Sequence, residues 1–293
     1  MRRAPGARAA RSLPFPPMQP MRIALSVAGS DPTGGAGLQL DLQVFRALGV
    51  HGAGVPTALT VQNTAAVLQV LPVFPSVVQG QLRALLGDLR PHAVKLGMLA
   101  SDDVLRAVAQ CLGELAEPAP PLVLDPLLFA SDGTPLLERR AWDGLRQLCA
   151  RAALLLPNLA EAEALCGRDV SSRAGVEAAA RACVLELGAA AALVKGGHAE
   201  GAPDDCLAQR ADGADGAGGG VQIAWLTGER LARGPVHGTG CALAAACAAH
   251  LARGAAMFDA VQRARDFVRG AIAESQQAGK GARLLVFGAN PAQ

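Results

Sequence analysis

ALSVAGSDPTGGAGLQLD, residues 24–41, reads as an apolar strand that breaks into a glycine-rich loop and then opens a helix. The loop carries four glycines: Gly29, Gly34, Gly35 and Gly37. Their bare backbone lets another group approach closely, and Asp41 follows in the helix. Near the start of an α/β chain, such a loop usually holds a small molecule, often a phosphorylated one.

Apolar runs and helical patterns alternate along the rest of the chain. The runs that predict strands are 22–28, 54–61, 93–99, 121–125, 153–157 and 191–196. The helical patterns lie at 37–48, 75–86, 101–115, 138–150, 159–187 in two pieces and 240–276. This alternation predicts a three-layer α/β fold, a mainly parallel sheet with helices on both faces. Residues 65–73 and 205–226 predict short strands, forming a small β flap over one end of the sheet.

No linker divides the chain, so we expect one domain at 21–280. Residues 1–20 carry arginines but neither an acidic residue nor the apolar core of a secretory signal. They predict a disordered extension, or a true start at Met18 or Met21. ADGADGAGGG at 211–220 predicts a flexible surface insertion, and residues 281–293 a C-terminal tail.

Composition argues against several function classes. A hydrophobic content of 51% with 18% charged residues indicates a globular protein with a large core. A net charge of +2, and 3% aromatic residues without tyrosine, argue against nucleic acid as a partner. No apolar run reaches the about 18–20 residues that span a bilayer, so no membrane partner is expected. Seven scattered cysteines without a CxxC predict reduced thiols in the cytoplasm.

The first glycine loop fails the tests for two common phosphate-binding loops. Gly29 and Gly34 have the first spacing of a Walker loop, but Gly35 and Ala36 stand where its Lys and hydroxyl residues belong. A dinucleotide fingerprint needs an acidic residue about 20 positions further on. The chain has none between Asp41 and Asp88, which argues against an NAD-dependent oxidoreductase.

A polar cluster, TVQNT at 60–64, follows the second strand. Ligands gather at the carboxyl ends of strands in an open sheet. Gln62 offers a donor and an acceptor in one plane, which suits the edge of a heteroaromatic ring. Asp41 could accept from an amino or hydroxyl group of the same ring. A turn with solvated amides explains this segment equally well.

The segment VHGTGCA, residues 236–242, precedes a helix rich in alanine and leucine. Gly238 and Gly240 expose backbone N–H groups at the helix N-terminus, where the helix dipole favours anions. Such a site can stabilise a phosphoryl group in transfer. Cys241 lies in the first turn, a position that lowers a thiol pKa. A small buried side chain is the alternative interpretation of Cys241.

Further polar residues follow other predicted strands: Asp125, Asn158, Glu161 and Lys195. Each alone could belong to an ordinary turn with a helix cap. Together at one edge of the sheet, they predict one site assembled from several loops. Carboxylates, a lysine and an anion hole suit a magnesium nucleotide better than a metal held by protein alone.

Seven motifs carry a resemblance to a known family. AGSDPTGGAGLQLDL, ALTVQNT, KLGML, VLDP, PNLAEAEAL, VKGGH and HGTGC occur in that family's order. Over roughly residues 22–275 the chain resembles the hydroxymethylpyrimidine and phosphomethylpyrimidine kinases of thiamin biosynthesis, within the ribokinase-like superfamily. The resemblance implies a ribokinase-like fold. It also implies phosphorylation of 4-amino-5-hydroxymethyl-2-methylpyrimidine, then of its monophosphate, with ATP and Mg²⁺.

The resemblance also implies site residues and a homodimer. In the pyrimidine pocket it places Gly29, Asp41, Gln62 and Met98. In the anion hole it places Gly238, Thr239, Gly240 and Cys241, with Cys241 the candidate to activate the hydroxyl. Near ATP it places Lys195, Asn158 and Asp125, with Glu161 at Mg²⁺.

Some features depart from the family's pattern. Ala242 replaces the usual threonine, LARGPV at 231–236 lacks an Asn/Thr-rich stretch, and the last residues do not match the family's tail. These departures bear mainly on the second phosphorylation, which must accommodate an extra phosphate. A pyridoxine or pyridoxal kinase of the same superfamily is the closest alternative. A non-catalytic pyrimidine sensor is disfavoured by Lys195, Glu161 and HGTGC.

Overall fold

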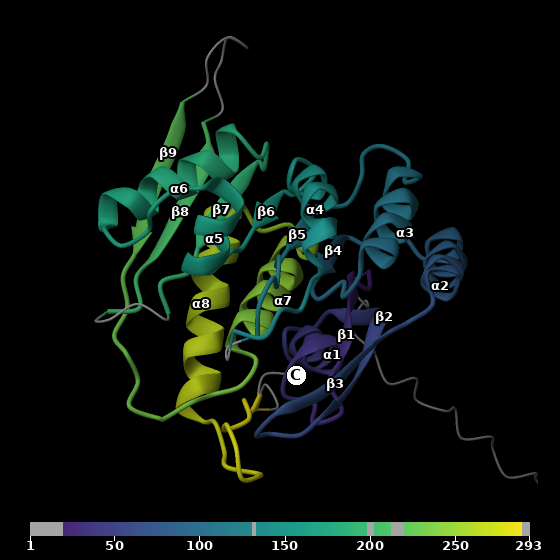
Figure 1. Ribbon diagram of the computed structural model, residues 1–293, viewed down its shortest axis with the longest axis horizontal. Helices are drawn as coiled ribbons and strands as arrows, with labels where there is room; N and C mark the ends of the chain where they lie inside the picture. The colour runs from purple at the N-terminus through teal and green to yellow at the C-terminus, as the bar shows by residue number, and fades with distance from the viewer. Residues whose placement is uncertain (1–19, 131–132, 198–201, 212–219, 289–293) are drawn as a thin grey trace, which may run out of the picture.

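Nine strands form one central sheet in the computed structural model, which describes residues 20–130, 133–197, 202–211 and 220–288 (Figure 1). The strands are β1 (Ile23–Ser30), β2 (His51–Gln62), β3 (Val67–Pro72), β4 (Ala93–Leu96), β5 (Leu122–Leu124), β6 (Leu154–Leu155), β7 (Ala191–Val194), β8 (Asp205–Arg210) and β9 (Val221–Leu226). Their order is β3-β2-β1-β4-β5-β6-β7-β8-β9. From β2 through β1, β4, β5 and β6 to β7, each neighbouring pair of strands is parallel, so the predicted mainly parallel sheet is confirmed.

Helices cover both faces of the sheet and make separate hydrophobic cores with it (Figure 1). One face carries α1 (Gly37–Ala47), α7 (Thr239–Ala252) and α8 (Met257–Ala273). The other carries α2 (Pro75–Asp88), α3 (Asp102–Gly113), α4 (Trp142–Cys149), α5 (Leu159–Cys166) and α6 (Arg173–Leu185), with a 3₁₀ turn at Arg139–Ala141. Because successive strand residues point to opposite faces, Ala24 packs in one core and Leu25 in the other.

The helical pattern predicted at 240–276 is two helices, α7 and α8. Gly254 separates them with a φ of +83°, a conformation that costs a glycine little. The N–H groups of Gly254 and Ala255 donate to Leu251 and His250, which closes the end of α7. Helix α7 is almost wholly buried and rich in alanine, so its backbone lies close to the sheet.

The expected β flap does not form as a separate sheet in the described chain. Strand β3 pairs antiparallel with β2, and β8 and β9 continue antiparallel from β7. Both segments therefore extend the central sheet at its edges. Strands β3 and β8 thus supply hydrogen-bond partners for the backbone groups of β2 and β7, which would otherwise be unpaired at the sheet edges.

The first residues expected to form a C-terminal tail pack onto the domain. Ala282 donates its N–H to the carbonyl of Thr64 at 2.8 Å, at the tip of the β2–β3 hairpin. Leu285 is buried, and Phe287 stacks on Phe267 of α8 at 5.4 Å. The predictions of a disordered extension at 1–20 and a flexible insertion at 211–220 fall almost entirely outside the described residues. No described helix is long and apolar enough to cross a membrane.

Candidate active site

Two glycine loops that lie far apart in the sequence contact each other at the carboxyl ends of the parallel strands. A Cβ on Gly238 would lie 1.9 Å from the carbonyl oxygen of Gly35. A Cβ on Gly35 would lie 2.7 Å from the ring of His237. Gly238 also has a φ of +76°. Glycine at both positions therefore brings the β1–α1 loop against the start of α7, so the two loops form one site.

The start of α7 has no side-chain cap, a geometry that suits an anion. Its N-cap is Gly238, which has no side chain to occupy the N–H groups of Thr239, Gly240 and Cys241. The helix dipole adds a partial positive charge at the same place. A Cβ on Gly240 would lie 3.4 Å from the Lys195 ammonium nitrogen. Backbone donors and a cation thus meet at one point, as the sequence predicted.

Lys195 and Asp125 form an ion pair behind this anion site. The Lys195 Nζ lies 2.8 Å from Asp125 Oδ1, and Asp125 is fully buried. Burial lowers the pKa of Lys195, but Asp125 and Glu161 outweigh it and the net pKa is raised. Lys195 is therefore an ammonium at neutral pH. Asp125 Oδ2 is also buried, and it has no hydrogen-bond partner within the described part of the chain.

Asn158 and Glu161 form a capping box at the start of α5. The Glu161 N–H donates to Asn158 Oδ1, and the Asn158 N–H donates to Glu161 Oε2, both at 2.9 Å. The Leu128 N–H donates to Glu161 Oε1 at 3.2 Å. Burial raises the pKa of Glu161 although Lys195 opposes it. Both side chains therefore have a structural task, so their places at ATP and Mg²⁺ stay predictions.

Cys241 lies at the first turn of α7 and is 8% exposed. Burial raises the pKa of its thiol to about 11, although Lys95 and the Gly37 N–H oppose the shift. The expectation of a lowered thiol pKa is wrong, because the cost of burying a thiolate exceeds the effect of the helix start. At neutral pH the residue is a thiol.

Asp41 is fully buried and does not face the site with any exposed surface. Its Oδ2 accepts hydrogen bonds from Ser26 Oγ at 2.5 Å and from Lys95 Nζ at 2.8 Å. Asp41 thus forms an ion pair inside the protein, and its expected contact with a ring stays a prediction. Lys95 is fully buried too, and Asp41 helps to hold its pKa above the ordinary value against the effect of burial. In the sequence, Lys95 could be noticed as a lysine within an apolar run, in a chain that has few lysines.

Gly29 and Met98 meet at the ends of β1 and β4. A Cβ on Gly29 would lie 2.3 Å from the terminal methyl group of Met98, so a larger residue at position 29 would displace the end of this side chain. Thr57 Oγ1 donates to the Met98 carbonyl oxygen. Nearby, Ala100 and Leu127 have φ values of 62° and 42°, which residues with a Cβ rarely adopt. Backbone strain of this kind is concentrated at functional sites.

Gln62 belongs to a chain of polar contacts that includes two residues without a predicted role. Asp31 Oδ2 lies 2.9 Å from His237 Nε2, and Gln62 Nε2 lies 3.0 Å from the same ring nitrogen. Asp31 Oδ1 accepts from the N–H and the hydroxyl of Thr33, each at 2.8 Å. His237 adjoins the glycines of its motif in the sequence, but nothing local indicates that it reaches β2.

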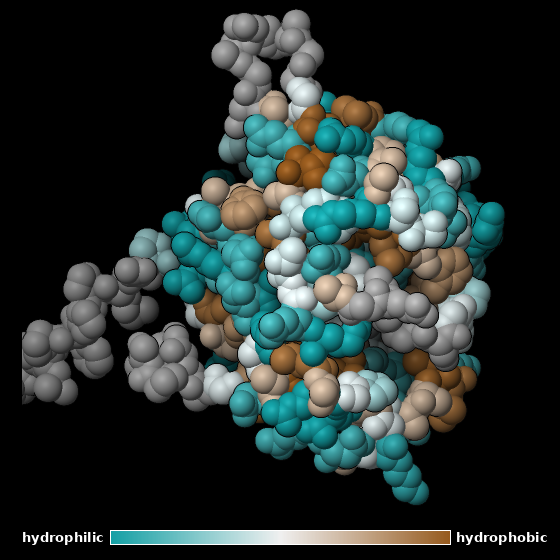
Figure 2. Space-filling view, turned by 90° about the vertical axis from the view of Figure 1, so that its left-hand side faces the viewer, coloured by the Kyte–Doolittle hydropathy of each residue, from teal (hydrophilic) through white to brown (hydrophobic). Residues whose placement is uncertain are grey.

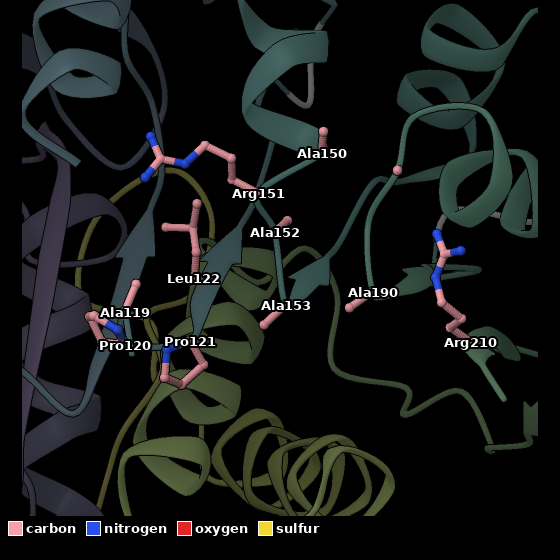
Figure 3. A pocket seen from close by; sticks show the side chains of 11 residues that line it. Ala119, Pro120, Pro121, Leu122, Ala150, Arg151, Ala152, Ala153, Ala190 and Arg210 are labelled. Atoms are coloured by element: carbon pink, nitrogen blue, oxygen red, sulfur yellow. The ribbon is translucent and has the colours of Figure 1, made fainter. Parts of the chain in front are cut away.

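A cavity of about 480 Å³ lies at the opposite edge of the sheet, at the amino ends of β5, β6 and β7 (Figure 3). Arg151 and Arg210 line it. Arg151 donates to the Leu112 carbonyl at 2.6 Å, and Arg210 donates to the Val184 carbonyl at 3.0 Å. Both arginines thus bind carbonyls at the C-terminal ends of α3 and α6, which is a structural task.

Comparison with known proteins agrees with this arrangement. The family described as phosphomethylpyrimidine kinase matches residues 31–285. A hydroxymethylpyrimidine/phosphomethylpyrimidine kinase from Rhizobium meliloti (strain 1021) is 38% identical over 256 residues, covering 87% of this chain and 92% of the relative.

Two solved structures are also similar. A pyridoxal kinase from Staphylococcus aureus in complex with AMP-PCP has a TM-score of 0.80 at 28% identity, covering 94% of this chain and 96% of that one. A phosphomethylpyrimidine kinase from Clostridium difficile 630 has a TM-score of 0.71 at 30% identity, covering 86% of this chain and 99% of that one.

Proposed function

The chain belongs to the phosphomethylpyrimidine kinase family, and we propose that it phosphorylates 4-amino-5-hydroxymethyl-2-methylpyrimidine with ATP, and then the monophosphate so formed. It is a kinase with the ribokinase-like fold. The observation that carries the proposal is the meeting of the uncapped start of α7 with Lys195, directly beside the β1–α1 loop.

The anion site at α7 would receive the γ-phosphoryl group in transfer. Charge spreads over the phosphoryl oxygens in the transition state, and fixed donors stabilise it without reorganising. The N–H groups that follow Gly238 and the ammonium of Lys195 supply such donors from two sides. Because the transition state is loose, most of the acceleration comes from positioning and from neutralising charge.

The acceptor ring would lie over the β1–α1 loop. Gln62 would hydrogen-bond its edge, while Gly29 and Met98 would form a wall beside it. We keep Cys241 as the candidate base for the hydroxymethyl group, because its thiol lies in the first turn of α7. With a pKa of about 11, only about one thiol in ten thousand is ionised at pH 7. Only this ionised fraction could accept the proton of the hydroxymethyl group, so the base would be a minor thiolate population.

Magnesium fits the donor set beside Lys195. Asp125 offers a buried carboxylate oxygen without a partner, and carboxylate oxygens suit this ion. Among the described residues, no group of three or more His, Cys, Asp or Glu could hold a metal by itself. Asp125, with Glu161 behind it, would bind Mg²⁺ together with the nucleotide phosphates. The ion would supply further neutralisation of phosphate charge.

The distribution of apolar surface supports a homodimer. The face around β9, α6 and α8 is mostly hydrophilic, with apolar residues scattered over it (Figure 2). In the described chain, six exposed large hydrophobic residues instead gather on β2, β3 and the start of α2: Leu59, Val61, Leu68, Leu71, Phe74 and Val77. Leu59 and Leu71 are direct partners across the β2–β3 ladder. Exposed apolar residues on neighbouring elements of this kind favour association with a second copy.

A cytoplasmic location accords with the cysteines. All seven are free thiols, although Cys166 Sγ and Cys183 Sγ lie only 3.5 Å apart. Thiols in such proximity persist where the compartment is reducing.

A coupled assay of ADP release tests the function. The purified chain is offered ATP and Mg²⁺ with the hydroxymethylpyrimidine, its monophosphate or pyridoxal, and a fourth sample lacks Mg²⁺. We expect turnover with both pyrimidines, a lower kcat/KM for pyridoxal and none without the ion. Preference for pyridoxal would identify a pyridoxal kinase. Binding of the pyrimidine without any ADP release would identify a sensor.

A Lys195→Gln variant is the matched test of the anion site. Loss of the ammonium is expected to lower kcat by about 100-fold or more, the range seen when one charge-stabilising donor is removed. Lys280→Gln, at an exposed lysine, is the control and should keep wild-type turnover. Equal turnover in both variants would argue against the proposed phosphoryl position.

A further inference from the structure

His237 is held between Asp31 and Gln62, in front of the start of α7. Its backbone N–H donates to the Arg283 carbonyl at 2.9 Å, and its ring packs against Gly35. The tail segment thereby holds the backbone of His237, and the glycine loop lies against its ring. Its Nε2 atom contacts Asp31 and Gln62 together.

Asp31 decides which atom of this contact carries a proton. Burial raises the pKa of Asp31, but the hydrogen bonds from His237 and Thr33 together have the larger effect. The net pKa of Asp31 therefore lies below its ordinary value. Asp31 is therefore a carboxylate, which only accepts hydrogen bonds. The His237 Nε2, 2.9 Å from Oδ2, must carry a hydrogen and donate it.

A protonated Nε2 has no lone pair for Gln62. The Gln62 amide nitrogen, 3.0 Å away, is also a donor, so two donors would face each other. A half turn of the amide exchanges its nitrogen and oxygen without changing the shape of the side chain. The carbonyl oxygen then shares the Nε2 hydrogen with Asp31, and the amide nitrogen points away from His237.

We propose that His237, held by Asp31, is a positioning residue that turns the Gln62 carbonyl toward itself, so that Gln62 presents its NH₂ group to the acceptor. This inference rests on the proposed function. The inference adds to the proposed function what Gln62 recognises, namely a ring atom with a lone pair such as a heteroaromatic nitrogen. Without His237 nothing holds the amide in this orientation, so the hydrogen bond from its NH₂ group to that atom is no longer secured.

Three variants test the proposal by steady-state kinetics with the hydroxymethylpyrimidine. His237→Phe keeps a ring but removes the donor; we expect the acceptor KM to rise about 10-fold, the effect of about one hydrogen bond. The kcat and the ATP KM should stay within about 3-fold, and His237→Gln, which restores a donor, should recover most of the affinity. Gln62→Glu should raise the acceptor KM at least as much, because a carboxylate has no hydrogen to donate.

A double variant separates positioning from a structural role. If His237 acts through Gln62, adding His237→Phe to Gln62→Ala changes the acceptor KM no further. A full 10-fold effect on that background, or wild-type KM in His237→Phe or Gln62→Glu, overturns the proposal. Equal melting temperatures show that the variants are folded. Absence of pyrimidine turnover in the wild type overturns the proposed function itself, and this inference with it.

Discussion

Lys95 and Asp41 place two opposite charges inside the protein, directly beneath the site. Neither side chain has exposed surface, and their atoms meet at 2.8 Å. Ionised groups are rarely buried without a partner, since desolvation costs several kcal/mol for each. At the scale of single residues, the ion pair therefore stabilises the buried base of the site, on which the glycine loop and Cys241 lie.

Removing one partner of this pair should be severe. We expect Lys95→Met to lower the free energy of unfolding by about 3–5 kcal/mol, because Asp41 is left as an unpaired buried charge. Urea denaturation measures the change. The exposed Lys280→Met is the control and should stay within about 0.5 kcal/mol. The double variant Lys95→Met, Asp41→Leu should recover stability, and a loss below 1 kcal/mol in Lys95→Met would contradict a charged pair.

Cys241 gives a pH-dependent prediction. If its thiolate is the base, the active fraction rises with pH up to the pKa of about 11, so kcat should increase about tenfold per unit between pH 7 and 9. Cys241→Ser should keep the acceptor KM, lose most turnover and remove this dependence. If kcat changed equally with pH in the wild type and in Cys241→Ser, the thiol would not be the base and would only line the site. The measurement is kcat at saturating ATP and acceptor across this range.

The start of α7 and the β1–α1 loop act as a pair of elements rather than as separate motifs. Each loop supplies a glycine where the other approaches, which is the reason for the 1.9 Å distance between a Cβ on Gly238 and the Gly35 carbonyl. The proposed acceptor side and the proposed phosphate side of the site are therefore in backbone contact. Movement of one loop must displace the other.

Gly238→Ala tests this coupling against a matched glycine. Gly238 and Gly254 have φ values of +76° and +83°, so alanine strains both, by about 1–2 kcal/mol. A Cβ on Gly254 meets nothing within 4 Å, whereas one on Gly238 collides with backbone. We expect Gly254→Ala to be less stable but active, and Gly238→Ala to lose kcat by about 100-fold or more. Similar activities in the two variants would show that the loop contact is dispensable.

For the whole molecule, the apolar residues on β2, β3 and α2 lie on the edge of the sheet that carries Gln62. Association of two copies through this edge would cover an exposed strand, which single-chain proteins otherwise protect. It would also brace the strand that presents Gln62 to the site.

Light scattering coupled to size-exclusion chromatography tests the dimer. We expect the wild type to have twice the mass of one chain. Leu71→Lys together with Phe74→Ser, two exposed residues of the apolar cluster, should yield monomers because burial of charge opposes association. Leu185→Ser, at an exposed leucine on α6, is the control and should remain dimeric. Monomeric wild type would refute the dimer, and a dimeric double variant would refute this interface.

The regular elements were accessible from sequence because their signals are local. Apolar runs marked all the parallel strands, and polar residues after them marked the strand ends where Lys195 and Asp125 meet. The break at Gly254 was missed, since alanine-rich patterns continue across it. The edge positions of β3, β8 and β9 were missed too, because pairing depends on partners distant in the chain.

The sequence by itself determined that glycine loops and strand-end polar residues gather at one edge of a parallel sheet. The pattern of apolar and polar residues along the chain is sufficient to predict the strands, the helices and the strand ends. Only the tertiary structure decided which groups are buried and which face one another. It sealed Asp41 with Lys95, raised the thiol pKa of Cys241 and brought His237 to Gln62. Burial and distance set these properties, and both depend on segments that meet only when the chain is folded.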